Sequence, residues 1–245
     1  DDGDLYDEFE MLYASLFKKP EPYIKVIKLL AKKKMGMTRQ ELITEGKLED
    51  NGALTDILKD LEWCGFIRGY SMLGKRVKHE VYQLIDHYTL FYYEFIHEQR
   101  HGSNFWQAMQ GKPAYNTWCG LAFERVCLWH IEQIKTKLGI SGILTNEYAW
   151  HCKADKDTQR PGVQIDLLIE RSDGIIDLCE MKYSKDQYVI SETYEKELIQ
   201  KRTVFAEVTK TKCAVHTIMV STNGIAHNAY SHEIQNEVSL NDLFL

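Results

Sequence analysis

The chain has 245 residues, of which 44% are hydrophobic and 27% charged, with only 4 Pro and 15 Gly. This composition excludes a disordered or collagen-like protein, and no apolar run reaches the roughly 20 residues that cross a bilayer. The length suits one large domain or two modest ones. The chain begins at Asp1 without an initiator Met or a signal peptide, which predicts a piece of a longer protein.

Cysteine usage indicates the compartment. The six cysteines are scattered without a CxxC pair, and a chain of this size needs no disulfides for stability. We therefore expect reduced, mostly buried thiols in a cytoplasmic protein.

Charge is distributed unevenly around the net value of −6. Residues 11–85 hold 14 Lys and Arg against 9 Asp and Glu, whereas residues 86–245 hold 16 against 21. A basic module joined to an acidic one points to a polyanionic partner for the first module.

Residues 1–85 are predicted to form a helical module that ends in a β-hairpin. Apolar residues recur at helical spacing in 5–17 and 23–34. Thr38 and Glu41 have the spacing of a capping box that begins a third helix, and Asn51 or Gly52 begins a fourth. Strands are expected at 66–71 and 80–85, around a basic loop. Three helices followed by a hairpin are the order of a winged helix-turn-helix domain.

The remainder is predicted to be a helical linker, 86–116, and an α/β module, 117–245. The linker carries an aromatic-rich helix from Asp86 to Gly102, whose aromatic side chains we expect to pack between the modules. A long helix begins near Thr117. It is followed by strands at 143–151, 163–170 and 175–183, a helix at 190–209, a strand at 214–221 and a short closing segment at 236–244. This order predicts a mixed sheet flanked by helices, within a chain that is α+β overall.

Three polar residues interrupt the two apolar strands that meet at the turn Ser172-Asp173-Gly174. Asp166 lies in the first strand, and Glu180 and Lys182 in the second. Alternation places Glu180 and Lys182 on one face, and hairpin pairing brings Asp166 beside them. The alternative is a surface salt bridge between Glu180 and Lys182, with Asp166 exposed.

Two carboxylates and an ammonium in an apolar sheet are costly to bury unless they bind a cation or one another. Oxygen ligands suit Mg²⁺ or Mn²⁺ and metal-assisted phosphodiester hydrolysis, in which Lys182 would orient the attacking water. Glu124, a lone carboxylate among apolar residues of the preceding helix, could supply a further metal or water contact.

This pattern resembles the PD-(D/E)XK nuclease superfamily: a helix Glu, then an Asp, then 13 residues, then Glu-x-Lys. The segments LYDEFEMLYASLF, WCGLAFERVCLWHIEQIK, GVQIDLLIER, LCEMKYS and NEVSLNDLF extend the resemblance to prokaryotic AAA-type ATP-binding proteins of Bacteroidetes and archaeal type. The similarity covers essentially all of the chain, which looks like the C-terminal half of such a protein.

The resemblance implies a restriction-endonuclease-like second domain with the catalytic set Glu124, Asp166, Glu180 and Lys182. The metal ligands would be Asp166, Glu180 and Glu124. It also implies that the ATPase core precedes Asp1, so that ATP would act only through that absent domain, which is a partner of this chain.

Two other motifs match only in part. Gly69 to Lys75 fits GxxxxGK, but Arg76 replaces the Ser or Thr that holds Mg²⁺, and the segment joins two strands. His97 to His101 fits HExxH, with Glu124 23 residues further on, but Gly102 follows the second His directly. We interpret the first as the wing of the winged helix. For the second, we favour two solvated histidines near a helix C-terminus, and a zinc protease is a distant third function.

Basic residues of the first module are the candidate contacts to nucleic acid. They flank the second and third predicted helices or lie in the loop of the hairpin: Lys34, Arg39, Lys75, Arg76 and Lys78. The fourth helix carries Lys59 against Asp56, Asp60 and Glu62. We therefore expect DNA binding with weak sequence specificity, or a winged helix used for protein contacts.

The sequence thus predicts the C-terminal portion of an AAA-type ATPase that interacts with DNA through a metal-dependent nuclease site. The alternative is a non-catalytic binding and regulatory module with a nuclease-like fold. The four intact signature residues favour the enzyme, and the acidic charge of the second module favours the alternative.

Overall fold

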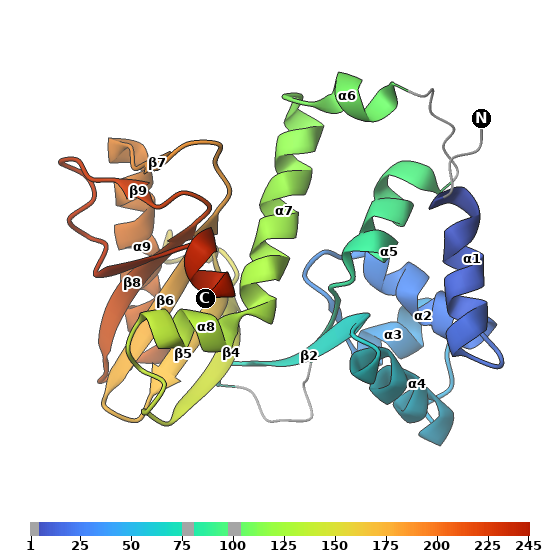
Figure 1. Ribbon diagram of the computed structural model, residues 1–245. Coiled ribbons are helices and arrows are strands. Elements are labelled where there is room, and N and C mark those ends of the chain that lie inside the picture. Colours follow the sequence, from blue (N-terminus) through green and yellow to red (C-terminus); the bar gives the residue numbers. More distant parts are fainter. Residues whose placement is uncertain (1–4, 75–80, 98–103) are drawn as a thin grey trace. The chain divides into compact units, whose positions relative to one another are not determined.

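The computed structural model describes residues 5–74, 81–97 and 104–245, so that the candidate DNA contacts Lys75, Arg76 and Lys78 lie outside the described residues. The chain divides into two compact units, one within 1–71 and 75–112 and the other within 72–74 and 113–245 (Figure 1). Both contain helices and strands, as the sequence predicts for a mixed α/β chain. No described helix is long and apolar enough to span a bilayer.

The first unit is mostly helical. Its elements are α1 (Leu5–Leu16), α2 (Glu21–Lys32), β1 (Met37–Thr38), α3 (Arg39–Gly46), α4 (Gly52–Trp63), β2 (Ile67–Met72), β3 (Val81–Leu84), α5 (His87–Phe91), the π-helix η2 (Tyr92–Ile96) and α6 (Phe105–Met109). Strand β3 pairs antiparallel with both β1 and β2. The hairpin predicted from the sequence is therefore confirmed, and the short strand β1 is added to it.

Side-chain caps fix where the helices of this unit begin. Thr38 accepts from the Glu41 amide and Glu41 from the Thr38 amide, which is the predicted capping box. The Asn51 side chain accepts from the Leu54 amide and begins α4. Before β1, Gly36 has φ +80°, and a Cβ there would lie 2.4 Å from the carbonyl oxygen of Tyr82. Only glycine fits this turn.

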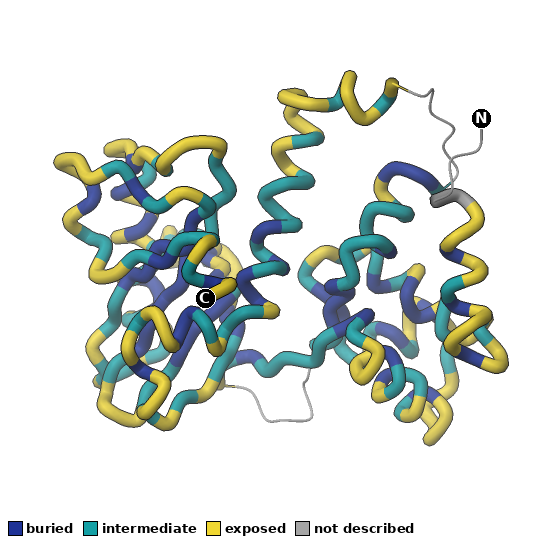
Figure 2. Tube along the Cα trace, in the orientation of Figure 1, coloured by how far each residue is buried: buried dark blue, intermediate teal, exposed yellow. Residues whose placement is uncertain are grey.

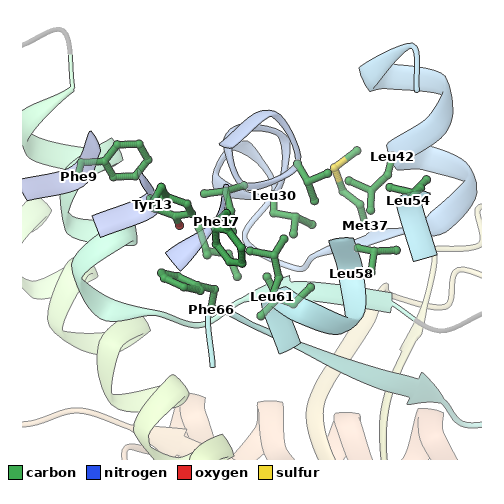
Figure 3. Packing of buried hydrophobic residues seen from close by; sticks show 14 residues of the cluster. Phe9, Tyr13, Phe17, Leu30, Met37, Leu42, Leu54, Leu58, Leu61 and Phe66 are labelled. Atoms are coloured by element: carbon green, nitrogen blue, oxygen red, sulfur yellow. The ribbon is translucent and has the colours of Figure 1, made fainter. Parts of the chain in front are cut away.

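A single apolar cluster holds the first unit together (Figure 3). Tyr13 of α1 is fully buried, and its hydroxyl shares a hydrogen bond with the Thr89 hydroxyl. Leu58 and Leu61 of α4 face Leu30 of α2, so that the helices meet along the stripes that the sequence predicts. The cluster places α4 with its polar side outward.

The second unit is built on a five-stranded sheet with helices on both faces. Its elements are α7 (Pro113–Trp129), α8 (Ile131–Lys137), β4 (Thr145–Cys152), β5 (Val163–Arg171), β6 (Ile175–Lys182), β7 (Tyr188–Val189), α9 (Glu192–Thr209), β8 (Ala214–Ser221), β9 (Ile225–Ala226), β10 (Asn236–Ser239) and the 3-10 helix η3 (Leu240–Phe244). The strand order is β4-β5-β6-β8-β10. Strands β4, β5 and β6 form an antiparallel meander, whereas β8 is parallel to both β6 and β10.

The sheet separates two apolar layers, and parts of its strands are buried (Figure 2). Phe123 and Cys127 of α7 pack on the face that carries Leu167, Ile169 and Cys179. On the other face, α9 contributes a second layer against alternate residues of the same strands, namely Val204 and Phe205 against Ile165, Leu168 and Leu178. We call these faces the α7 face and the α9 face.

A β-bulge interrupts β5 at the position of the predicted acidic residue. Tyr148 pairs with Leu168 but Trp150 pairs with Ile165, so that two residues of β5 lie opposite Ala149 of β4. Those two residues are Asp166 and Leu167. The extra residue shifts the alternation, which is why Ile165 and Leu168 both belong to the α9 face.

Three expectations about local structure are wrong. The helix expected from Asp86 to Gly102 ends at Ile96, because His97 has an extended backbone. The long helix from Thr117 begins earlier, at Pro113, and breaks at His130 into α7 and α8. Of the six cysteines, only Cys127 and Cys179 are buried, although none forms a disulfide.

The aromatic residues of the expected linker pack on one another within the first unit. Phe91 and Phe95 each contact Trp106, with ring centroids 5.2 and 5.7 Å apart. Tyr88 packs against the main cluster of the same unit. These contacts all lie within the first unit, in contrast to the expected packing between the modules, and Trp106 is 36% exposed.

We predict that Thr38→Ala lowers the free energy of unfolding by about 1 kcal/mol, because it removes the capping hydroxyl. Thr44→Ala is the matched control, since Thr44 is an exposed residue inside the same helix and Ala is the better helix former. Urea denaturation followed by circular dichroism measures both. An equal effect of the two substitutions would contradict the assigned role of the cap.

Candidate functional site

Glu180 and Lys182 share the α9 face, as the sequence predicts. They alternate with Met181, which belongs to the α7 face, and both contact residues of α9. Glu180 is 8% exposed, in line with the buried Leu178 two residues before it. The pair therefore lies where the sheet meets α9.

Helix α9 supplies both partners of the Glu180 carboxylate. The Lys201 ammonium donates to Oε1 at 2.5 Å, and the Tyr194 hydroxyl donates to Oε2 at 3.2 Å. Burial raises the pKa of Tyr194, and the negative charge of Glu180 adds to this. Tyr194 thus stays a neutral hydrogen-bond donor. The expected alternative, a salt bridge between Glu180 and Lys182, is replaced by the pair with Lys201.

Lys182 has a different environment. Its Nζ lies 4.9 Å from the centroid of the Tyr194 ring, a cation–π contact. Its register partner on β8 is Ser221, which is fully buried and whose Oγ has no hydrogen-bond partner within the described residues. Tyr194 thus bridges the two charged residues of the Glu-x-Lys pattern, through its hydroxyl to one and its ring to the other.

Asp166 does not join this group. Its Oδ1 accepts from the Gln164 side chain at 2.6 Å. Gln164 alternates with Val163 and Ile165, which belong to the α9 face, so that Gln164 and Asp166 point to the α7 side. The bulge thus turns the Asp166 side chain away from the α9 face, where Glu180 lies.

Glu124 lies on α7, on the side of the sheet opposite α9. It is half-buried between Phe123 and Arg125, which are both buried. Burial raises the pKa of Cys127, one turn further along α7, and the charge of Glu124 adds to this. Glu124 and Asp166 thus belong to one side of the sheet, and Glu180 and Lys182 to the other.

Asp166 and Glu180 thus lie on different faces of the sheet, and the divalent-cation site that the family resemblance implies stays a prediction. Such a site needs the carboxylates of Asp166 and Glu180 on the same ion. Glu180 has both oxygens engaged by α9, and Asp166 points to the α7 side. Within the described residues, no group of three or more His, Cys, Asp and Glu side chains is placed to hold a metal.

The two partial motifs can be followed only in part. The next described element after β2 is the strand β3, which agrees with the wing interpretation of the GxxxxGK match, and residues 75–80 lie outside the described residues. His97 of the HExxH match follows the last residue of η2 and contacts the ring of Tyr93. Residues 98–101 lie outside the described residues.

The two described cations among the candidate DNA contacts differ in exposure. Lys34 is exposed in the turn before β1. Arg39 donates to the Asp50 carboxylate at 2.9 Å and to the Asn51 carbonyl at 3.0 Å. Arg39 thus joins α3 to the start of α4, and this structural role limits its availability to a phosphate.

A second buried carboxylate was not singled out from the sequence. Asp177 of β6 is 1% exposed, with Arg171 at 3.4 Å and His216 at 3.6 Å. Burial raises its pKa despite the positive charge of Arg171. Arg171 also binds the exposed Asp173, and this hydrogen bond lowers the pKa of Asp173.

Sequence reasoning also missed Tyr194, Lys201 and Ser221. A signal for the first two was present, because they are seven residues apart on a predicted helix and therefore share one side of it. Nothing in the sequence connects that side of the helix to Glu180. The connection depends on how α9 crosses the sheet.

We predict opposite pH dependences for Asp177→Asn and Asp173→Asn. Because the pKa of Asp177 is raised in the folded protein, folding favours its protonated form. Its contribution to the free energy of unfolding is therefore largest below the pKa of about 3.9 in the unfolded chain, and it falls as pH rises through the folded pKa. Asp177→Asn should therefore gain stability relative to the parent as pH rises. Asp173 has a lowered pKa, so that Asp173→Asn should lose stability relative to the parent above the same unfolded value. Thermal unfolding across the acidic range measures both, and parallel curves for the two variants would contradict the assignment.

Comparison with known proteins found no match for this chain. No protein-family model matches the chain, and no curated protein and no solved structure matches it either. A function for this chain therefore rests on its own residues.

Proposed function

We propose that this chain is the winged-helix and nuclease-like portion of an AAA-type ATPase, and that its second unit is a non-catalytic binding and regulatory module. The order of elements supports the two folds. Helix, short strand, two helices and a hairpin suit a winged helix. The second unit has the order of a PD-(D/E)XK-like core: a helix, an antiparallel meander of three strands, a helix, and a strand parallel to the third strand of the meander.

The observation that carries the non-catalytic proposal is the separation of the two carboxylates. Metal-dependent hydrolysis needs Asp166 and Glu180 on the same ion. Here Asp166 is turned to the α7 side by the bulge, and Glu180 is neutralised by Lys201. The cluster on the α9 face thus has the charge balance of a structural group.

We expect the chain to show no Mg²⁺- or Mn²⁺-dependent cleavage of plasmid or single-stranded DNA. Glu180→Gln should lower the free energy of unfolding by about 1–3 kcal/mol, because Lys201 loses its charged partner. Glu207→Gln, an exposed change on the same helix, should leave stability unaltered. Cleavage assays and thermal unfolding of the three proteins provide the measurements.

The nuclease alternative gives the reverse pattern. A parent protein that cleaves DNA with Mg²⁺, a Glu180→Gln variant that is inactive but at least as stable, and an active Glu207→Gln variant would establish it. The observation in its favour is that Glu180 and Lys182 do share one face.

We further propose that the winged helix binds DNA weakly and without strong sequence preference. Support comes from the exposed Lys34 and, in the sequence, from Lys75, Arg76 and Lys78, which follow β2. The acidic outer residues Asp56 and Glu62 of α4 disfavour close contact of this helix with phosphates.

The combined variant Lys75→Ala, Arg76→Ala, Lys78→Ala tests this proposal. Its DNA affinity should fall, and the slope of log affinity against log salt should decrease by about 0.9 for each lost phosphate contact. Substituting the exposed Lys153, Lys156 and Lys185 of the second unit removes the same charge elsewhere and should change neither quantity. Salt titrations by fluorescence anisotropy measure both, and equal losses in the two variants would show that only net charge matters.

A further inference from the structure

A groove on the first unit is not used by either proposed function. It lies between α2 and α4, and it combines apolar side chains with lysines. We propose that this groove, which we call the α2–α4 groove, is a docking site for an acidic, amphipathic segment of a partner protein. The inference concerns the first unit alone and goes beyond both proposed functions.

The first step of the argument is the apolar surface that the core of this unit leaves uncovered. The α2–α4 groove has a volume of about 440 Å³. Val26 and Leu54 belong to the core cluster, whereas Ile57 is half-buried and Ala53 is exposed. Such a surface can hold the apolar side chains of a bound segment. Its apolar lining comes from α2, from α4 and from the segment between α3 and α4: Pro22, Val26, Leu48, Ala53, Leu54 and Ile57.

The second step is that the groove is already formed in the free chain. Gly46 allows the end of α3 to pack tightly, since a Cβ there would lie 2.6 Å from Leu29 Cδ1 and 3.0 Å from Leu48 Cγ. The Tyr23 hydroxyl donates to the Asp60 carboxylate at 2.6 Å and joins α2 to α4. The walls are thus fixed before binding, and a preformed site loses less conformational entropy when a ligand binds.

The third step is the charge around the groove. Lys25 and Lys47 line it, both are exposed, and neither forms an ion pair in the part of the chain that the structure describes. Glu21 and Glu49 also line it, but the Glu49 carboxylate accepts from the Asn51 side chain at 3.0 Å. Glu21 lies in the first turn of α2, where the helix dipole stabilises its charge. Further exposed lysines precede α2 or lie along it: Lys18, Lys19 and Lys28.

The mixed lining distinguishes a protein segment from a nucleic acid. A DNA duplex presents evenly spaced phosphates, so that it would leave the apolar lining uncovered and bring phosphates near Glu21 and Glu49. A peptide can place apolar side chains in the groove and carboxylates opposite Lys25 and Lys47. Apolar lining and charge complementarity together favour an acidic, amphipathic segment.

The experiment selects ligands without assuming their sequence. A random-peptide phage library is panned on the whole chain, and the enriched peptides are synthesised with a fluorescent label. Fluorescence anisotropy then compares their affinities for the parent and four variants, each of which is checked for folding by circular dichroism. Ala53→Trp fills the groove, and Ala14→Trp is the same change at an exposed site of α1. Lys25→Glu reverses a charge of the lining, and Lys59→Glu reverses an exposed charge of α4 outside it.

The enriched peptides should carry apolar residues flanked by Asp and Glu. Ala53→Trp should abolish their binding, because the new side chain occupies the groove. Lys25→Glu should weaken binding roughly tenfold, since an attractive charge becomes a repulsive one. Ala14→Trp and Lys59→Glu should bind the peptides as the parent does.

The inference is overturned if no peptide is enriched, if the enriched peptides lack acidic residues, or if Ala53→Trp binds them as tightly as the parent. Should Ala53→Trp fail to fold, equal losses in Lys25→Glu and Lys59→Glu would contradict it. A DNA duplex that loses affinity in Lys25→Glu but not in Lys59→Glu, without any enriched peptide, would assign the lysines to nucleic acid instead.

Discussion

The β-bulge in β5 is the constraint on which the polar groups of the second unit depend. Two residues opposite Ala149 shift the alternation of the strand, so that Ile165 and Leu168 both face α9 while Asp166 faces the α7 side. Regular alternation would have placed Asp166 on the α9 face, with Glu180. One inserted residue thus turns Asp166 away from the face that carries Glu180 and Lys182.

Helix α9 supplies the positive charge that the buried Glu180 requires. Because Glu180 is buried, its charge must be neutralised. Lys201 does this, and the Tyr194 hydroxyl, seven residues earlier on the same side of the helix, donates to the other oxygen. The apolar layer of Val204 and Phe205 holds that side against the sheet. Apolar packing therefore holds Lys201 and Tyr194 beside Glu180. These two partners engage both oxygens of its carboxylate.

The buried pair differs from the second charged cluster, around Asp177. Glu180 has a donor on each oxygen, whereas burial raises the pKa of Asp177 in spite of Arg171 and His216. Two carboxylates on the same strand thus have opposite roles. The first is paired with residues of α9, and the second reduces stability as it ionises.

The sequence by itself determined most of the secondary structure, since local chemistry fixes it: the Thr38–Glu41 capping box, the start of α4 at Asn51, the hairpin turn at Gly174, and the strand at 214–221. It also placed Glu180 and Lys182 on one face, because strand alternation follows from adjacency. Only the tertiary structure decided the bulge at Asp166, the break between α7 and α8, and the approach of Lys201 to Glu180. These depend on how neighbouring strands and helices pack, and spacing along one chain does not encode which side of a strand an extra residue will turn.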